Sequence, residues 1–323
     1  MAELALFATA PRGLEALLAD ELTALGARQV RAGRAGVACR GDLELAYRAC
    51  LWSRVASRVL LNLARFDAPD PDALYAAVRE LPWEEHLDLD ATFAVDASLS
   101  DAAIGHSQFA ALRVKDAVAD RFRELHGRRP SVDRVQPDLR LNLALHGRRA
   151  VLSLDLSGDS LHRRGYRPAG AAAPLKENLA AGVLLLAGWP ALAARGGALV
   201  DPLCGSGTLA VEAALLAAGI APGLGRARFG FEGWLGHVPA LWRRVHAAAA
   251  DQGDLGRVPP LRASDRDPRA LALAREAAER AGVAGAVQFA RGALVDLAAP
   301  DGAQPGLVVA NPPYGARLGA VEG

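Results

Sequence analysis

The stretch Leu199–Thr208, LVDPLCGSGT, decides the fold of the C-terminal half. It reads as a short apolar strand, an acid at Asp201, a turn containing Gly205 and Gly207, and the start of a helix. Glycines let a backbone approach a ligand and adopt conformations that other residues avoid. Amides at the following helix N-terminus favour negatively charged groups. A GxG turn is weak evidence by itself, because an ordinary strand–turn–helix connection has the same pattern.

The spacing around this turn disfavours a nicotinamide site. Dinucleotide sites have a GxGxxG turn with an acid roughly 20 residues later. Here the next strand-end acid, Asp265 in LRASDRDP, follows a long insertion that contains FGFEGW. Two acids at adjacent strand ends suit a nucleoside with an amino-acid tail, Asp201 for the ammonium and Asp265 for the ribose hydroxyls. We therefore predict S-adenosylmethionine as the ligand, with Cys204 as a small packing residue rather than a nucleophile.

The elements around this turn predict an α/β fold with a doubly wound parallel sheet, because strands alternate with helices. The expected strands cover 198–200, 261–265, 287–289 and 307–310, and the expected helices cover 177–186, 208–218 and 268–281.

The N-terminal half also alternates strands and helices, followed by a hairpin. The strict alternation of leucines in 139–145 and of apolar residues in 150–156, across an HGRR turn, predicts an antiparallel pair with one buried face. The remaining expected strands cover 4–10, 57–66 and 92–98, and the expected helices cover 14–25, 42–52, 73–80 and 108–125.

Composition narrows the class of protein. A length of 323 residues suggests about two domains, and the net charge of +1 argues against a generic polyanion binder. Residues 121–167 nevertheless hold eleven Arg against five acids, a local charge of +6, which fits either a solvated surface or a nucleic-acid contact. The three cysteines have no metal-ligand spacing, and no apolar run reaches about 18 residues. We expect a reduced, cytoplasmic, soluble protein without a metal.

The segment GLVVANPPYGARLG (306–319) carries the second motif. Asn311 follows a strand, and its amide oxygen and the carbonyl of Pro312 offer two acceptors for an exocyclic NH2 group. Two such acceptors orient a poorly nucleophilic base amine toward an electrophilic methyl group, and Tyr314 can stack on the base. The alternative is a strand that ends at a Pro-Pro turn, with the tyrosine as a packing residue.

Together these motifs make the chain resemble the class I S-adenosylmethionine-dependent methyltransferases of base amino groups. More narrowly, it resembles the THUMP-domain 23S rRNA guanine-N2 methyltransferase family. The resemblance covers essentially the whole chain, through FATAPRGLEALLADEL, AYRACLWSRVASRVL, FAALRVKDAVADRFRE, LSLDLSGDSLHRRGYR, APLKENLAA, DPLCGSGTLAVEAA and NPPYGARLG.

The resemblance implies roles for named residues. The cofactor set would be Asp201, Cys204, Gly205, Gly207, Asp265 and Asp267. The set that holds the target guanine would be Asn311, Pro312 and Tyr314. Lys176, Glu177 and Asn178 match a segment that lies over the cofactor in this family.

The resemblance also implies a domain order. A ferredoxin-like part at 1–66 and a THUMP domain at 67–164 would bind RNA, with 23S rRNA as the partner. A linker at 165–174 would precede a Rossmann-like methyltransferase domain at 175–323. The basic stretch 121–167 would be an RNA backbone contact.

Two departures from the family qualify this expectation. Relatives place an acid near the cofactor adenine after the third strand, where this chain has Ala293. We expect either that Asp296 substitutes for it or that the adenine contact is lost. The chain also lacks the last three of the family's seven strands, so we expect a fragment of a longer protein. The alternatives are a tRNA guanine-N2 or DNA adenine methyltransferase, or an inert RNA-binding fragment.

Overall fold

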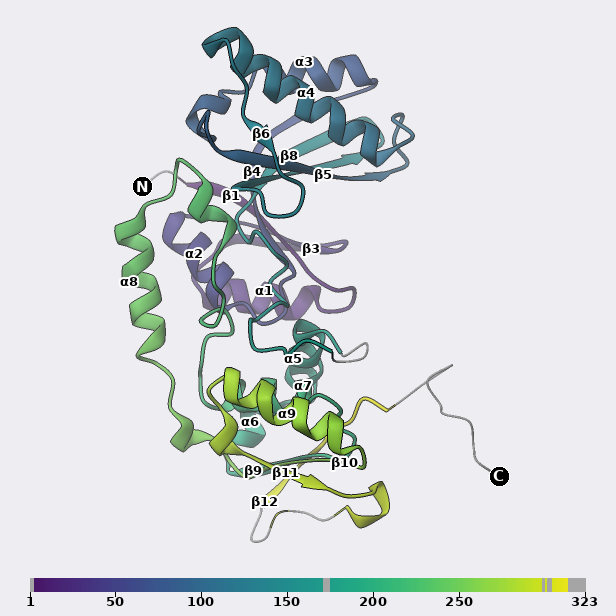
Figure 1. Cartoon of the computed structure of the whole chain (residues 1–323), viewed down its shortest axis with the longest axis vertical. Coiled ribbons are helices and arrows are strands. Elements are labelled where there is room, and N and C mark those ends of the chain that lie inside the picture. The colour runs from purple at the N-terminus through teal and green to yellow at the C-terminus, as the bar shows by residue number, and fades with distance from the viewer. Residues whose placement is uncertain (1–2, 171–174, 298–299, 301–303, 313–323) are drawn as a thin grey trace. The chain divides into compact units, whose positions relative to one another are not determined.

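The computed structural model describes residues 3–170, 175–297, 300 and 304–312 (Figure 1). The chain forms two compact units. Unit 1 comprises residues 1–50, 56–161 and 227–245, and unit 2 comprises 51–55, 162–226 and 246–323. Each unit is therefore assembled from separate stretches of the sequence. No helix among the described residues has the length and apolar character needed to span a bilayer.

Unit 1 is built on one mixed sheet with the order β2-β3-β1-β4-β8-β7-β5-β6. The strands are β1 Leu4–Thr9, β2 Arg28–Gly33, β3 Gly36–Gly41, β4 Arg58–Asp67, β5 Thr92–Ser100, β6 Ser131–Val132, β7 Leu139–His146 and β8 Arg149–Asp155. The helices are α1 Glu15–Ala24, α2 Leu43–Trp52, α3 Pro71–Arg79 and α4 Ser107–His126. The first four strands form the ferredoxin-like half and the last four the THUMP half, joined by antiparallel pairing of β4 with β8.

The predicted hairpin is confirmed, since β7 and β8 pair antiparallel across Gly147. The four leucines of β7 are buried and alternate with less buried residues, as a strand with one core face requires. Strands β2 and β3 were not predicted. Five of the six residues of β2 are exposed, so this edge strand lacks the apolar alternation that marks a strand in sequence.

The insertion around FGFEGW belongs to unit 1. It contains a 3-10 turn at Gly230–Gly233, and the helix α8 (Pro239–Ala250) begins in it. The ring centroid of Phe231 lies 4.5 Å from that of Tyr47 and 4.9 Å from that of Trp242. The Tyr47 hydroxyl accepts from Val238 N at 2.9 Å and lies 2.7 Å from His237 Nδ1. An aromatic cluster therefore attaches this late segment to α2.

Unit 2 contains a four-stranded parallel sheet with the order β11-β10-β9-β12. The strands are β9 Gly197–Asp201, β10 Leu261–Asp265, β11 Val287–Arg291 and β12 Gln304–Val308. The helices α5 Glu177–Leu186, α6 Trp189–Ala193, α7 Thr208–Ala217 and α9 Pro268–Arg280 lie along one side of it (Figure 1). The predicted parallel α/β sheet is confirmed, and its strand order reverses between β9 and β12, which is where doubly wound sheets bind ligands.

Strand β12 begins and ends earlier than the predicted 307–310. A Cβ on Gly306 would lie 1.8 Å from the carbonyl oxygen of Ala198, so only glycine permits this close approach to β9. The register of the pairing between β12 and β9 also shifts between Gln304 and Leu307. The pairing therefore extends upstream through a glycine that apolar patterning does not recognise.

Candidate functional site

Asp201 ends β9 and is 1% exposed. Its Oδ1 accepts from Leu203 N at 3.3 Å, and its Oδ2 has no hydrogen-bond partner among the described residues. Burial raises the pKa of Asp201 to about 7, with the Leu203 N–H opposing the shift and the Asp265 carboxylate adding to it. A buried carboxylate with one unsatisfied oxygen is a receptor for a cationic donor.

The two predicted glycines of the turn are favoured over other residues for different structural reasons. Both have positive φ, 52° at Gly205 and 79° at Gly207. A Cβ on Gly207 would lie 2.9 Å from the Cβ of Ala274, so this glycine lets α7 and α9 approach each other. A Cβ on Gly205 would meet nothing within 4 Å, so the backbone there borders open space. Gly205 therefore leaves room where a ligand would meet the loop.

Asp265 ends β10 and ties the turn to the neighbouring strand. Its Oδ2 accepts from Gly205 N at 2.9 Å, and its Oδ1 accepts from Asp267 N at 2.9 Å. Asp267 Oδ1 in turn accepts from Arg269 N at 2.8 Å and caps α9, with Pro268 at the first helical position. The structure thus brings together the predicted acids at the ends of β9 and β10.

Asn311 and Pro312 follow β12 and are exposed. Val308 is paired with Val200 in β9, and Val309 N donates to the carbonyl of Val200 at 3.0 Å. Because adjacent parallel strands end at one edge of a sheet, Asn311 follows its strand on the edge where Asp201 ends β9. Tyr314 lies outside the described residues.

Cys204 lies between the two acids and is buried, and its N–H donates to the carbonyl of Ser264 at 3.0 Å. Burial raises the pKa of its thiol far above the ordinary value, and Asp201 and Asp265 add to the shift. A thiol that stays protonated is a poor nucleophile. Its contacts are those of a packing residue.

Asp296 ends the 3-10 turn Leu294–Asp296, and its side chain lies outside what the structure describes. Ala293, the position where relatives would carry an acid, is exposed. The described side chains therefore include no carboxylate at the start of this turn.

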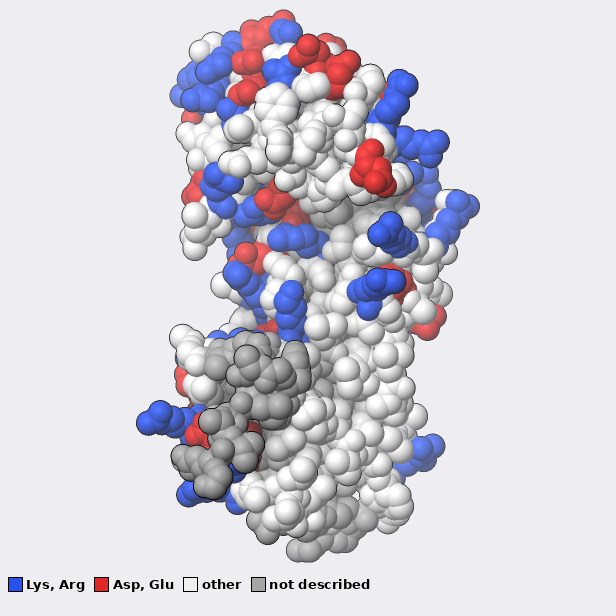
Figure 2. Space-filling view, turned by 90° about the vertical axis from the view of Figure 1, so that its right-hand side faces the viewer, with Lys and Arg blue, Asp and Glu red and all other residues white. Residues whose placement is uncertain are grey.

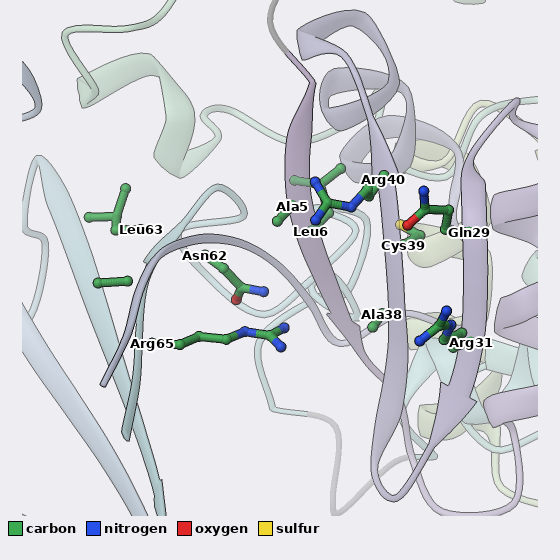
Figure 3. Close-up of a pocket in the computed structure, with 11 residues that line it drawn as sticks. Ala5, Leu6, Gln29, Arg31, Ala38, Cys39, Arg40, Asn62, Leu63 and Arg65 are labelled. Atoms are coloured by element: carbon green, nitrogen blue, oxygen red, sulfur yellow. The ribbon is translucent and has the colours of Figure 1, made fainter. Parts of the chain in front are cut away.

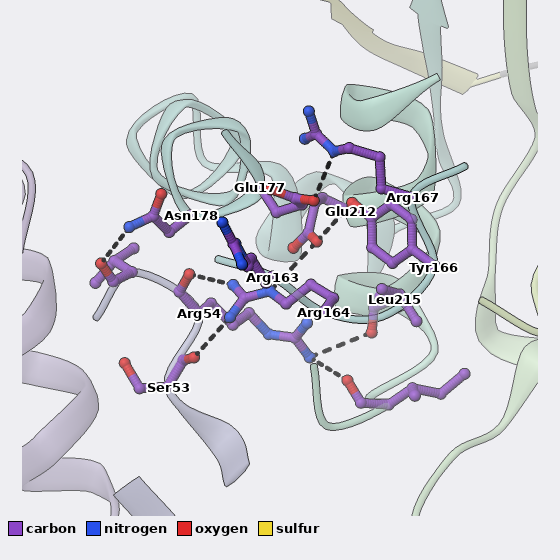
Figure 4. Close-up of polar contacts among 12 residues, drawn as sticks. Ser53, Arg54, Arg163, Arg164, Tyr166, Arg167, Glu177, Asn178, Glu212 and Leu215 are labelled. Atoms are coloured by element: carbon purple, nitrogen blue, oxygen red, sulfur yellow. Dashed lines mark hydrogen bonds and ion pairs between the residues drawn. The ribbon is translucent and has the colours of Figure 1, made fainter. Parts of the chain in front are cut away.

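Lys176 is the exposed N-cap residue of α5, whereas Glu177 and Asn178 begin the helix and take part in a buried polar network (Figure 4). Glu177 is 1% exposed, and its Oε1 accepts from Arg167 Nε at 2.9 Å. Burial raises the pKa of Glu177, against the lowering effect of Arg167. Asn178 is also buried and donates to the carbonyl of Val55 at 3.4 Å. Both side chains therefore point into the unit rather than to solvent.

Sequence reasoning missed the partners of this network. Glu212 is fully buried in α7, where Tyr166 donates to its Oε1 at 3.0 Å and Arg164 Nε lies 3.6 Å from the same oxygen. Burial and the nearby Glu212 carboxylate raise the pKa of Tyr166 well above its ordinary value. The available signal was a lone acid in the apolar helix TLAVEAALLA, since a buried acid requires a donor or a cation.

The described residues contain no cluster of three His, Cys, Asp or Glu side chains arranged to hold a metal ion.

Comparison with known proteins places these features in a family. The chain matches the RlmL ferredoxin-like domain over residues 5–60, the THUMP domain over 68–155 and the RMKL-like methyltransferase domain over 164–322. It is 58% identical over 98% of its length to the ribosomal RNA large subunit methyltransferase K/L of Syntrophotalea carbinolica, and 54% identical over 97% to that of Pseudomonas paraeruginosa.

Solved structures agree with this match. A predicted N6-adenine-specific DNA methylase from Listeria monocytogenes has a TM-score of 0.87 and 34% identity, over 98% of this chain and 82% of that one. SMU.472, assigned as a methyltransferase and complexed with SAH, has a TM-score of 0.86 and 31% identity over the same shares. The chain belongs to a family of methyltransferases with a THUMP domain and an RMKL-like methyltransferase domain.

In this THUMP-domain methyltransferase, the three matched regions follow one another along the chain. The two compact units do not, because each is built from several separate stretches of the sequence. Residues 227–245 lie inside the methyltransferase match but belong to unit 1. The chain spans about half the length of the curated relatives it matches, 45% and 44% for the two named above.

Proposed function

We propose that the chain is part of an enzyme that transfers a methyl group from S-adenosyl-L-methionine to the exocyclic N2 amino group of a guanine in 23S rRNA. One observation carries the proposal. The unsatisfied carboxylate of Asp201 and the acceptor pair of Asn311 and Pro312 follow adjacent parallel strands at one sheet edge, where the strand order reverses. Neighbouring strand ends would then contribute both halves of a group-transfer site.

The cofactor half of the site fits the proposed ligand. The unpartnered Oδ2 of Asp201 would accept from the ammonium of the methionine moiety, directly or through water. Asp265, fixed by two backbone N–H groups, would hold the ribose hydroxyls. Five residues would complete or support the site: Cys204, Gly205, Gly207, Asp267 and Asp296. The segment Lys176–Asn178 would lie over the cofactor. When bound, the cofactor supplies an electrophilic methyl group on a sulfonium.

The substrate half acts by orientation. The Asn311 side-chain oxygen and the Pro312 carbonyl would accept the two N–H groups of the guanine amine, so that its nitrogen lone pair faces the cofactor. Formation of the new C–N bond would break the bond between the methyl carbon and the sulfonium sulfur, which leaves S-adenosylhomocysteine. The amine would release to solvent one of the two protons that Asn311 and Pro312 accept. Tyr314 would stack on the base after it leaves its helix.

The substrate class rests on the N-terminal match and on the curated relatives. The relatives are named for ribosomal RNA, and the THUMP match covers residues 68–155. The Listeria neighbour is named as a DNA methylase, so DNA is a necessary arm of the test, as is tRNA. We place the enzyme in the cytoplasm, where its rRNA substrate is made. We retain the boundaries 1–66, 67–164, 165–174 and 175–323 for its domains.

Methyl transfer from labelled cofactor to undermethylated 23S rRNA, tRNA and DNA tests this proposal. We expect transfer to rRNA alone. Asn311→Ala should reduce transfer by about 100-fold or more, the typical effect of removing one oriented polar group, with cofactor affinity retained in calorimetry. Loss of cofactor binding in this variant would make Asn311 structural, and RNA binding without transfer in the wild type would favour an inert RNA-binding fragment.

A further inference from the structure

One face of the ferredoxin-like half carries a basic surface that the helices leave open. Leu6, Val37 and Cys39 point to the buried face, where α1 packs. Pairing of Ala5 with Arg40, and of Arg31 with Ala38, places both arginines on the opposite face, because side chains alternate along a strand. Both are exposed.

This face is hollowed into an open depression of about 400 Å³ (Figure 3). Five polar side chains from three strands line it: Gln29, Arg31, Arg40, Asn62 and Arg65. The pairing of β4 with β8 shifts register between Asn62 and Ala64, and such an irregularity bends a strand. The depression therefore lies beside a bend built into β4. We call these five residues the arginine face.

The charge of the arginine face is only partly compensated. Arg40 and the neighbouring Arg28 share one acid, Glu3, at 3.5 and 3.0 Å. Arg31 and Arg65 form no ion pair among the described residues. Four arginines against one carboxylate leave three positive charges around the depression. Asn62 Oδ1 accepts from Ser153 Oγ at 2.9 Å, so its NH2 group remains a donor.

The basic stretch 121–167 behaves differently. Seven of its eleven arginines have a carboxylate partner outside that stretch or at its edge. Examples are Arg121 with Glu84 at 2.7 Å and Arg148 with Asp67 at 2.5 Å. On the face shown in Figure 2, blue and red atoms lie side by side at the height of α3 and α4. The local charge of +6 is therefore largely neutralised in the fold.

We propose that the arginine face binds the phosphate backbone of the RNA substrate, an inference that rests on the proposed function. Guanidinium groups match phosphate oxygens bidentately, and uncompensated positive charge is what releases counterions from a nucleic acid. Phe7 lies on the same face by register, and its ring packs over Gly36, where a Cβ would be 2.8 Å from Phe7 Cζ. A half-buried aromatic ring beside arginines suits an RNA strand, because its bases can stack on the ring while the arginines contact its phosphates.

The salt dependence of RNA binding tests this surface. We compare two triple variants of the full chain. The face variant carries Arg31→Ala, Arg40→Ala and Arg65→Ala. The matched control variant carries Arg123→Ala, Arg128→Ala and Arg148→Ala, whose arginines are ion-paired. Affinity for a 23S rRNA fragment is measured from about 0.05 to 0.3 M salt. The face variant should lower the slope of log K against log salt by about 2, since each phosphate contact contributes about 0.7–0.9.

The control variant should change this slope by less than about 1. An unchanged slope in the face variant, an equal loss in the control, or a wild type that binds a DNA duplex of equal length as tightly would each overturn the inference. Thermal unfolding and binding of S-adenosylhomocysteine in the face variant verify that both units remain folded. If the wild type methylates rRNA while the face variant binds it normally, the surface assignment fails and the proposed function stands. If the slope falls but no transfer to any RNA occurs, the surface stands and the function fails.

Discussion

Among the described residues, each unit buries one aspartate near the end of a strand, but only one of the two forms an ion pair. Asp155 of unit 1 and Asp201 of unit 2 are both 1% exposed. Asp155 Oδ1 accepts from Ser157 N at 2.9 Å, and its Oδ2 is ion-paired with Arg58. Asp201 has one long hydrogen bond and one oxygen without a partner among the described residues.

The difference separates a carboxylate that supports a fold from one that is held for a ligand. Arg58 also donates to the carbonyl of Gly158 at 2.7 Å, so the cation that balances Asp155 joins β4 to the chain after β8. A buried charge without such a partner lowers stability, and it persists where another component supplies the partner. In unit 2 the proposed function assigns this part to the ammonium of the cofactor.

The largest expected effect comes from removing the unsatisfied charge. The pKa of Asp201 is raised from 3.8 to about 7 in the folded protein. Between these values the native state holds a proton that the unfolded state has lost, so this group lowers stability as pH rises from about 4 to 7. Asp201→Asn should remove this loss, and denaturant unfolding should show the variant more stable than wild type at pH 8 by up to about 4 kcal/mol.

The same variant should bind the cofactor about 10- to 100-fold more weakly at pH 8, because a charge-assisted contact is lost. Wild-type cofactor affinity should fall as pH decreases below about 7, and that of the variant should change less. Equal stabilities of the two proteins from pH 4 to 8 would show that Asp201 is not desolvated as the structure has it.

A somewhat smaller effect on stability is expected from breaking the ion pair between Arg58 and Asp155. Arg58→Ala leaves Asp155 buried without its cation and should destabilise unit 1 by about 3 kcal/mol. Denaturant unfolding of this variant, beside one that also carries Asp155→Asn, measures the effect. The second substitution should recover part of the loss, and no recovery would mean that Arg58 acts through packing.

The contrast between these aspartates could not be read from the sequence. Strand β9 and its turn are recognisable because their apolar run and glycines are contiguous. Asp155 and Arg58 are separated by 97 residues, and nothing local distinguishes a partnered acid from an unpartnered one. The predicted strand ends nevertheless placed Asp201 and Asp265 together correctly, since parallel strands end at one edge.

The same limit explains the missed elements and charges. Strand β2 is exposed at five of its six residues, and the insertion at 227–245 packs on Tyr47, far earlier in the chain. The basic stretch 121–167 looked free because its acids, such as Glu84 and Asp90, lie 37 and 38 residues away from their arginines. Local patterns predict elements, whereas tertiary pairing decides which charges are available.

Asp265 differs from both buried aspartates. Both of its carboxylate oxygens accept backbone N–H groups, but its side chain is only partly buried. Asp265→Ala should weaken cofactor binding by about tenfold in calorimetry, the effect of losing one charge-assisted contact. Asp265→Asn keeps one acceptor oxygen and should lose less. Unchanged affinity in the alanine variant would remove the ribose role.

The smallest effect is expected at Cys204, beside Asp201. Its thiol is buried, its pKa is raised by that burial, and its sulfur lies 3.7 Å from the carbonyl oxygen of Gly205. Burial and the two neighbouring carboxylates disfavour the thiolate, so we expect the thiol to contribute volume. Cys204→Ala should therefore change methyl transfer and cofactor affinity by less than about threefold, with a stability loss near 1 kcal/mol from the cavity. If Cys204→Ala instead reduced methyl transfer as much as Asn311→Ala, with cofactor affinity intact, the sulfur would take part in the chemistry. The thiol would then react in surroundings that disfavour its thiolate form.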